Sequence, residues 1–434
     1  MTLRRQPLDF QVQERPAPAY VASLGRAWAT GTPHAVYELT KTSLTTPDAA
    51  NFLARDLSRL EGGPGTRLQV EYAGLKDKHA VTRQLVSIGL GEKLGEKLGR
   101  TLPTRIEGIS WWAELKGFAA RALSSSDIEG NTFTLVVRDL TRKSANQMSR
   151  HADALTLGDA HEPGLVPPRE HEAGHASRTL IITNYFGAQR FGSARHGKGF
   201  VATHLVRGDF EQALKLAIAT PARKDVGKLR TFTRLAAGHW GDWSMLARDL
   251  PSLPERRPIE ALARGASFQQ AFTQLPSFLQ AMYLEAFQSH VWNRAAAAMT
   301  RALCSSSGGA SLFTASDDFG EMVFARAASV VSDLRTVDMP VLAPSTELRE
   351  PWGPFADRAL RDEGLALADL RVPGLRRPFF GEAPRPLFAR VERFRLGAVE
   401  PDELATSAKR LKREAAFDLP RGAYATVVMR ALGQ

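Results

Sequence analysis

Apolar and polar side chains alternate on both sides of one charged segment of the chain. Leu68, Val70 and Tyr72 are separated by polar residues, and this period of two predicts a half-buried strand. Residues 83–88 (RQLVSI) predict a second strand. The segment between these strands is therefore expected to be a loop, where a rigid scaffold can present a reactive group.

Other stretches have helical spacing. Thr46 is expected to cap a helix with Pro47 at its first position, followed by an apolar stripe from Ala49 to Leu60 that suits packing on a sheet. The remaining elements that we predict are strands at 36–39, 130–138 and 180–182, helices at 210–218, 278–291 and 401–416, and a central strand in the apolar run of 417–430.

Length and charge restrict the class of protein. A chain of 434 residues is too long for one ordinary core and predicts two or three domains. With 43% hydrophobic and 24% charged residues it is typical of a globular protein. The formal net charge of +11 fits a nucleic-acid partner, although an anionic membrane surface would meet the same electrostatics.

Three features of the sequence concern the cellular compartment. No apolar run reaches the length of a transmembrane helix, and the first residues lack the apolar core of a signal peptide. The single cysteine, Cys304, excludes an internal disulfide and fits a reducing environment. We therefore expect a cytoplasmic protein that does not bind membranes.

The charged loop carries the strongest candidate chemistry. Asp77 lies between Lys76 and Lys78, with His79 and Arg83 beyond them. Cations this close favour an ionised carboxylate. Such a group suits a nucleophile or a group that recognises a phosphate-bearing partner, whereas a solvated, charged hairpin tip would explain the same residues.

The motif around this loop resembles a known family. AGLKDK followed by AVTRQ, within residues 72–84, is similar to the signature of the TruD family of pseudouridine synthases. Further stretches resemble the family in the same order along the chain: QPLDFQVQE at 6–14, GNTFTLVVR at 130–138, NYFGAQRFG at 184–192, QSHVWN at 288–293 and FDLPRGAYAT at 417–426. The resemblance therefore extends over most of the sequence.

This resemblance implies an α+β fold with a discontinuous catalytic domain. The pseudouridine-synthase catalytic domain would contain a mixed, largely antiparallel sheet with flanking helices. Its first part is expected at residues 1–180 and its second part at 388–434, with an inserted TRUD α/β domain at 181–387 between them.

The resemblance also implies a set of site residues. Asp77 would be the catalytic nucleophile, acting on either ribose C1′ or the base. Phe10 and Phe417 would line the uridine pocket, Phe133 would stack on the target base, and Asn131 would contact the substrate or orient the nucleophile. Arg4 occupies the position six residues before Phe10 where the family usually has a lysine.

The implied activity is isomerisation of uridine to pseudouridine in tRNA, with uridine 13 of the D arm as the usual bacterial target. The reaction involves neither redox change nor group transfer, so we expect no cofactor, and no obligatory protein partner. The alternative is a catalytically silent RNA-binding protein on the same fold, although such a protein would gain nothing from Asp77 facing phosphates.

Two weaker signals lie outside these motifs. HEAGH at 171–175 matches the zincin pattern, but Gly174 and the upstream prolines disfavour the helix that a zinc peptidase needs, so we expect no metal site. Arg190 suits either an RNA phosphate or an acidic neighbour. Arginines between 371 and 395 are expected to contact phosphates, and Trp292 to anchor a core.

Overall fold

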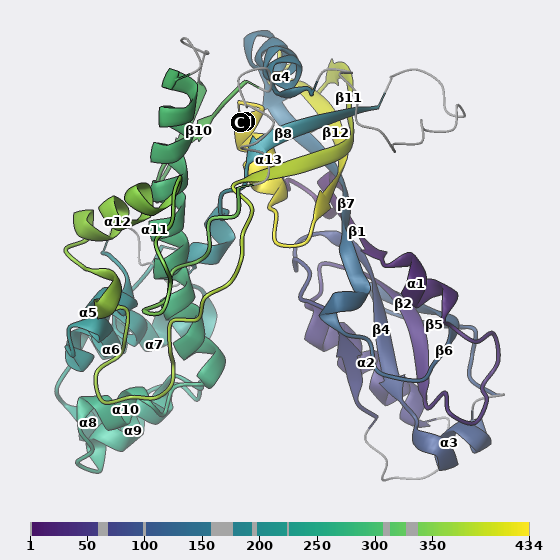
Figure 1. Cartoon of the computed structure of the whole chain (residues 1–434). Helices are drawn as coiled ribbons and strands as arrows, with labels where there is room; N and C mark the ends of the chain where they lie inside the picture. The colour runs from purple at the N-terminus through teal and green to yellow at the C-terminus, as the bar shows by residue number, and fades with distance from the viewer. Residues whose placement is uncertain are drawn as a thin grey trace. The chain divides into compact units, whose positions relative to one another are not determined.

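The computed structural model describes residues 2–59, 68–98, 101–157, 177–192, 198–223, 225–306, 313–326 and 337–433 (Figure 1). The chain divides into two units. Unit 1 contains Met1–Ile181, Ala389–Ala425 and Leu432–Gln434, and unit 2 contains Ile182–Phe388 and Thr426–Ala431. The HEAGH stretch at 171–175 lies outside the described residues.

Unit 1 is built on one large sheet with the strand order β5-β6-β2-β4-β1-β7-β12-β11-β8, and β3 pairs with β4 beside this path. Strands β1 and β4 run parallel, whereas the pairs β1–β7, β7–β12, β12–β11, β4–β2 and β2–β6 are antiparallel. The mixed, largely antiparallel sheet with flanking helices confirms the expected α+β class. The strands are β1 (Phe10–Pro16), β2 (His34–Thr42), β3 (Val70–Tyr72), β4 (Val81–Gly89), β5 (Arg105–Gly108), β6 (Trp111–Ala119), β7 (Ile128–Leu140), β8 (Arg178–Thr183), β11 (Phe388–Pro401) and β12 (Leu411–Pro420).

The helices of unit 1 are α1 (Pro18–Ala22), α2 (Thr46–Arg59), α3 (Gly91–Leu98) and α4 (Arg142–Leu155). Helix α2 buries Leu53 and Leu57 in the same apolar cluster as Tyr37 of β2 and Ile88 of β4. The predicted cap is wrong by one residue, because the Asp48 amide donates to Thr45 Oγ1 rather than to Thr46.

Two sequence predictions for the last part of the chain are wrong. Residues 401–416 were expected to be helical, but Leu411–Pro420 form β12, which lies between β7 and β11. Basic residues at helical spacing mimicked a helix face there, and pairing with two neighbouring strands outweighs such local propensity. The central strand predicted over 417–430 is present only at 417–420, the end of β12, and the rest of that run contains helix α13 (Ala425–Ala431), since a short apolar run does not distinguish strand from helix.

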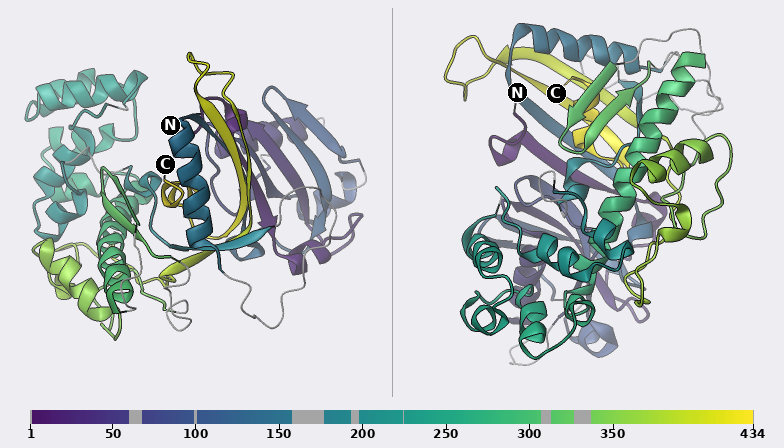
Figure 2. Two further views of the ribbon diagram at one scale, coloured as in Figure 1. Left: turned by 90° about the horizontal axis from the view of Figure 1, so that it is seen from above. Right: turned by 90° about the vertical axis from the view of Figure 1, so that its left-hand side faces the viewer.

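Unit 2 is predominantly helical in its described part and is organised around one long helix, α11 (Figure 2). Its helices are α5 (Val201–Val206), α6 (Phe210–Ile218), α7 (Gly227–Gly238), α8 (Trp243–Asp249), α9 (Arg256–Ala263), α10 (Phe268–Phe272), α11 (Ser277–Ser306) and α12 (Gly353–Asp362), with an antiparallel hairpin of β9 (Phe313–Asp317) and β10 (Gly320–Phe324). Trp292 of α11 is buried, and its Nε1 donates to the Met339 carbonyl at 2.7 Å, as expected of a core anchor.

None of the described helices combines the length and the apolar character that crossing a bilayer requires.

Candidate active site

The register of the sheet in unit 1 places one residue from each of five strands in a single row. Lys41 of β2 pairs with Thr82 of β4, which pairs with Val12 of β1. Val12 pairs with Phe133 of β7, which pairs with Phe417 of β12. Because paired residues project to the same face of a sheet, all five side chains share one face.

Three of the predicted pocket residues form an aromatic cluster on this face. Phe10 lies two residues before Val12, so it projects to the same side of β1. The rings of Phe10 and Phe133 meet edge to face with centroids 6.2 Å apart, and those of Phe133 and Phe417 are 5.7 Å apart. All three side chains are buried. The structure thus brings together aromatic residues that are more than 400 positions apart in the sequence.

The Asp77 loop connects β3 and β4 beside this row, as the alternating pattern predicts. Arg4 Nη1 lies 2.7 Å from Asp77 Oδ2, and the His79 backbone amide donates to Oδ1 at 2.9 Å. Lys41 Nζ donates to the Asp77 backbone carbonyl at 2.8 Å. The carboxylate is therefore held at both oxygens, and its backbone is tied to β2.

Arg4 joins the aromatic cluster to the carboxylate. Its guanidinium lies over the Phe10 ring, 4.1 Å from the centroid, while Nη1 contacts Asp77. Nη2 is buried and has no hydrogen-bond partner among the described residues. The backbone of Arg4 has a φ of +67°, a conformation that residues other than glycine adopt rarely and that the surrounding structure must hold in place.

A buried ionic network holds this N-terminal turn. Asp9 Oδ2 accepts the amide hydrogens of Arg5 and Gln6, and Asp9 Oδ1 accepts from Arg138 Nε at 2.9 Å. Arg138 also donates to Asp402 at 2.8 Å. Burial opposes ionisation of Asp402, but hydrogen bonds from the Asp139 amide and Arg138 outweigh it and keep the pKa of Asp402 below its ordinary value.

Asn131 is oriented by a second buried ionic contact. Lys76 Nζ lies 2.6 Å from Glu14 Oε1 and donates to Asn131 Oδ1 at 3.0 Å. The other Glu14 oxygen accepts the Leu85 amide. With Oδ1 occupied, the Asn131 Nδ2 hydrogens are available to a substrate, since they bond to no described residue.

Gly130 precedes Asn131 at a point where β7 and β12 approach closely. A Cβ atom at Gly130 would lie 2.1 Å from the Leu419 carbonyl oxygen. The position therefore requires glycine, and any side chain there would displace the strand that carries Asn131.

The electrostatic environment of the loop is unusual at Lys41. Its side chain is fully buried, and this burial lowers the pKa of Lys41 to about 8, with Asp77 raising and Lys76 lowering it. Lys78 and His79 are exposed beside the same carboxylate. The site thus combines a fixed carboxylate, aromatic rings and an accessible cation at Lys78.

The sequence predicts Asp77, Arg4, Asn131 and the three phenylalanines as site residues, but it does not predict the residues that contact and position them. It indicates Lys76 only as a neighbouring charge. The remaining supporting residues are Lys41, Glu14, Asp9 and Arg138. A charged residue inside an otherwise apolar strand pattern is the signal that could have identified Lys41 and Glu14.

Arg190 belongs to unit 2 and pairs with an acidic neighbour, Glu285, at 2.9 Å, which is one of the two alternatives left open by the sequence. Within the described residues, no three His, Cys, Asp or Glu side chains are grouped so that they could hold a metal ion.

Comparisons with known proteins give matches that cover almost the whole chain. Residues 1–432 match the family model described as tRNA pseudouridine synthase D (TruD). The chain is 27% identical over 435 residues to tRNA pseudouridine synthase D of Aquifex aeolicus, covering 98% of each chain. It is 29% identical over 454 residues to a probable tRNA pseudouridine synthase D of Halobacterium salinarum, covering 99% of this chain and 92% of the relative.

A solved structure shares the fold. The crystal structure of the putative tRNA pseudouridine synthase D from Methanosarcina mazei has a TM-score of 0.62 at 21% identity, covering 99% of this chain and 92% of that one. The fold and the family match define a tRNA pseudouridine synthase, an isomerase. The chain belongs to the TruD family.

Proposed function

We propose that this enzyme converts uridine 13 in the D arm of tRNA to pseudouridine, with Asp77 as the nucleophile. The observation that carries the proposal is the Asp77 carboxylate, held by Arg4 and the His79 amide beside the aromatic cluster. The choice of position 13 rests on the resemblance to the family's bacterial members. The proposal also places the enzyme in the cytoplasm, with tRNA as its partner and no obligatory protein partner.

The reaction breaks the bond between ribose C1′ and base N1, rotates the detached uracil, and forms a bond between C1′ and C5. C5 loses a proton and N1 gains one, so the product has the same atoms as the substrate and the reaction requires no cofactor. The Asp77 carboxylate attacks either C1′ or the base and is released in the second half of the reaction. Both possibilities are compatible with an aspartate whose two oxygens are held in place.

The uridine must leave its stack to reach Asp77, at a cost of about a few kcal/mol. Phe10, Phe133 and Phe417 offset this cost by providing aromatic and apolar surface for the flipped base. Asn131 Nδ2 and Arg4 Nη2 are donors without partners among the described residues, so we assign them to uracil or ribose oxygens. The donors also keep the detached uracil from diffusing away while it rotates.

The test is pseudouridine mapping on an unmodified tRNA transcript treated with the full-length purified enzyme. The wild type is expected to form pseudouridine at position 13. Asp77→Asn removes the nucleophilic charge at nearly constant shape, and we expect its turnover to fall by more than about a thousandfold. Asp153→Asn, which changes an exposed carboxylate of the same unit, is the matched control and should retain activity.

Three outcomes would contradict the proposal. If a folded Asp77→Asn protein turns over at the wild-type rate, Asp77 is not the nucleophile. If the wild type modifies tRNA only at other positions, the assignment to uridine 13 is wrong. If the wild type binds tRNA without modifying it, the catalytically silent alternative holds.

A further inference from the structure

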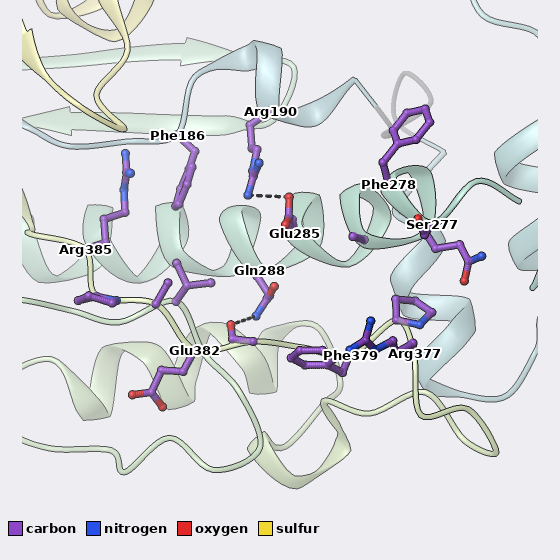
Figure 3. Close-up of a pocket in the computed structure, with 17 residues that line it drawn as sticks. Phe186, Arg190, Ser277, Phe278, Glu285, Gln288, Arg377, Phe379, Glu382 and Arg385 are labelled. Carbon is purple, nitrogen blue, oxygen red and sulfur yellow. Dashed lines mark hydrogen bonds and ion pairs between the residues drawn. The ribbon is translucent and has the colours of Figure 1, made fainter. Parts of the chain in front are cut away.

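Unit 2 contains a pocket that the proposed chemistry does not use. It has a volume of about 670 Å³, within the range of roughly 300–1,000 Å³ that is typical of ligand sites. Its walls are the first turns of α11 and the segment 377–385, with Phe186 and Arg190 at one side (Figure 3).

The pocket holds exposed aromatic rings. Phe278 and Phe379 are 67% and 65% exposed, and they are the aromatic members of the exposed large apolar side chains in the described part of the chain. Both line this one pocket. In Figure 3 both lie at the end where α11 begins, and the Phe278 ring points away from the segment that carries Phe379. Exposed phenylalanine rings that line one pocket indicate a binding surface for a flat or apolar group.

A buried amide provides an independent sign of a ligand. Gln288 is 4% exposed, and its Nε2 donates to the carbonyl oxygens of Leu342 at 2.7 Å and Gly381 at 2.9 Å. These bonds fix the amide plane. Its Oε1 accepts no hydrogen bond from a described residue. An oriented acceptor without a protein partner suits an N–H at the edge of a ligand.

The charges of the pocket leave one cation available. Glu285 pairs with Arg190, and Glu382 accepts from the Thr346 hydroxyl. Arg385 is buried and donates to the Asn184 carbonyl. Arg377 is exposed and forms no ion pair or hydrogen bond with a described residue. This wall of the pocket therefore favours a ligand with an anionic group.

We infer that this pocket binds one unstacked nucleotide of the tRNA outside the catalytic uridine. Phe278 and Phe379 offer aromatic surface to the base, Gln288 accepts from an N–H on its edge, and Arg377 contacts a neighbouring phosphate. Aromatic surface together with a free arginine is the combination with which proteins hold single-stranded nucleotides. The inference rests on the proposed function only in taking tRNA as the RNA.

The test measures the dissociation constant of an unmodified tRNA transcript with full-length enzyme. Phe278→Ala with Phe379→Ala is expected to weaken binding between about fivefold and a hundredfold. Both side chains are exposed, so the double variant should keep the wild-type melting temperature. Phe379→Leu keeps the apolar bulk and should bind as weakly as Phe379→Ala, whereas Phe379→Tyr keeps the ring and should restore affinity.

Arg377 is tested through the salt dependence of binding. Arg377→Gln is expected to reduce the steepness of the plot of log affinity against log salt concentration by about 1, the contribution of one phosphate contact. Val226→Ala and Arg358→Gln are matched controls, since both side chains are exposed in unit 2 and do not line the pocket. These controls should leave both the affinity and the slope unchanged.

The inference is overturned if the double phenylalanine variant binds tRNA within twofold of the wild type, or if Phe379→Leu restores affinity as well as Phe379→Tyr. It is also overturned if the wild type does not bind tRNA, in which case the pocket serves a partner of another class. Pseudouridine formation by the wild type is scored separately, so failure of the proposed reaction is distinguished from failure of this site.

Discussion

The Asp77 site and the pocket of unit 2 use similar side chains in opposite ways. At the Asp77 site the charged groups are largely buried and paired: Lys76 with Glu14, Arg138 with Asp9, and Lys41 with a backbone carbonyl. In the pocket of unit 2 the aromatic rings are exposed, and Arg377 has no described partner. At the Asp77 site most charged groups hold one another in place, whereas the pocket of unit 2 leaves its aromatic rings and Arg377 accessible.

This difference fits the two roles that we propose for these regions. A nucleophile misplaced by about 1 Å can lose about a hundredfold in rate, so its supporting groups must be fixed before the substrate arrives. Fixing charges inside a protein requires that each one be paired, because a lone buried charge is costly. Holding a nucleotide of a flexible polymer requires accessible surface and an unpaired cation instead.

The largest effect is expected from breaking the buried network behind Arg4. Arg138→Met leaves Asp9 and Asp402 buried without their cation, and loss of one partner of such a network costs about 3–5 kcal/mol. Urea denaturation should show this loss of unfolding free energy. Arg142→Met, an exposed arginine on α4 without a described partner, is the control and should change it little.

A stability of Arg138→Met equal to that of Arg142→Met would show that the network does not hold unit 1 together. Paired buried charges would then not be what distinguishes the Asp77 site from the pocket of unit 2.

Much of the sheet could be predicted from sequence, since it depends on local alternation. The strands around the Asp77 loop and helix α2 appear where the pattern predicts them. The failures at β12 and α13 occur where local pattern is ambiguous and pairing partners decide. Those partners are distant in sequence: β12 pairs with β7, and no local feature of residues 411–420 indicates this.

For the candidate site, the sequence predicted the groups that we propose meet a substrate but not those that position them. Asp77 and Asn131 stand in recognisable motifs. Lys41 shares a row with Phe133 only because Lys41 pairs with Thr82, Thr82 with Val12, and Val12 with Phe133, which is a consequence of strand register. The arginines between 371 and 395 were expected to contact phosphates as a group. Arg385 instead donates to the Asn184 carbonyl and Arg393 to Asp418, whereas Arg377 is free among the described residues.

Gly130→Ala tests the close approach that positions Asn131. Because the new Cβ would meet the Leu419 carbonyl oxygen at 2.1 Å, we expect a loss of about 1–3 kcal/mol of unfolding free energy together with reduced turnover. Gly89→Ala is the control, since a Cβ there meets nothing within 4 Å. Urea denaturation and single-turnover kinetics would measure the two effects. Equal stability of the two variants would contradict the steric argument.

Lys41→Met separates positioning from stability. The substitution removes the bond from Nζ to the Asp77 carbonyl but also removes a buried charge, so at pH 7 the unfolding free energy should stay within about 1 kcal/mol of the wild type. We expect kcat to fall about 10- to 100-fold, because the loop that carries the proposed nucleophile is released from β2. Little change in kcat would show that the loop is held by other contacts.

The pH dependence of the unfolding free energy tests whether Lys41 is a buried amine that titrates near pH 8. Burial lowers its pKa from 10.5 to about 8 in the folded protein, so the unfolded chain binds more protons between these values. Wild-type stability should therefore rise with pH across this window relative to Lys41→Met. A constant difference between the two proteins from pH 7 to pH 10 would contradict the burial of a titrating amine at this position.

The smallest effect is expected from Arg4→Lys, which keeps the charge and changes its shape. An ammonium can still pair with Asp77 Oδ2, but it cannot at the same time lie flat over Phe10 and present a free Nη2. We expect kcat to fall only a few-fold, against tenfold or more for Arg4→Met, measured by single-turnover pseudouridine formation. If Arg4→Lys and Arg4→Met lower kcat equally, the planar guanidinium group is essential. Arg4 then acts on the substrate rather than mainly as a counter-charge to Asp77. If lysine equals arginine, charge alone suffices at this position, and the free guanidinium nitrogen has no part in binding uridine.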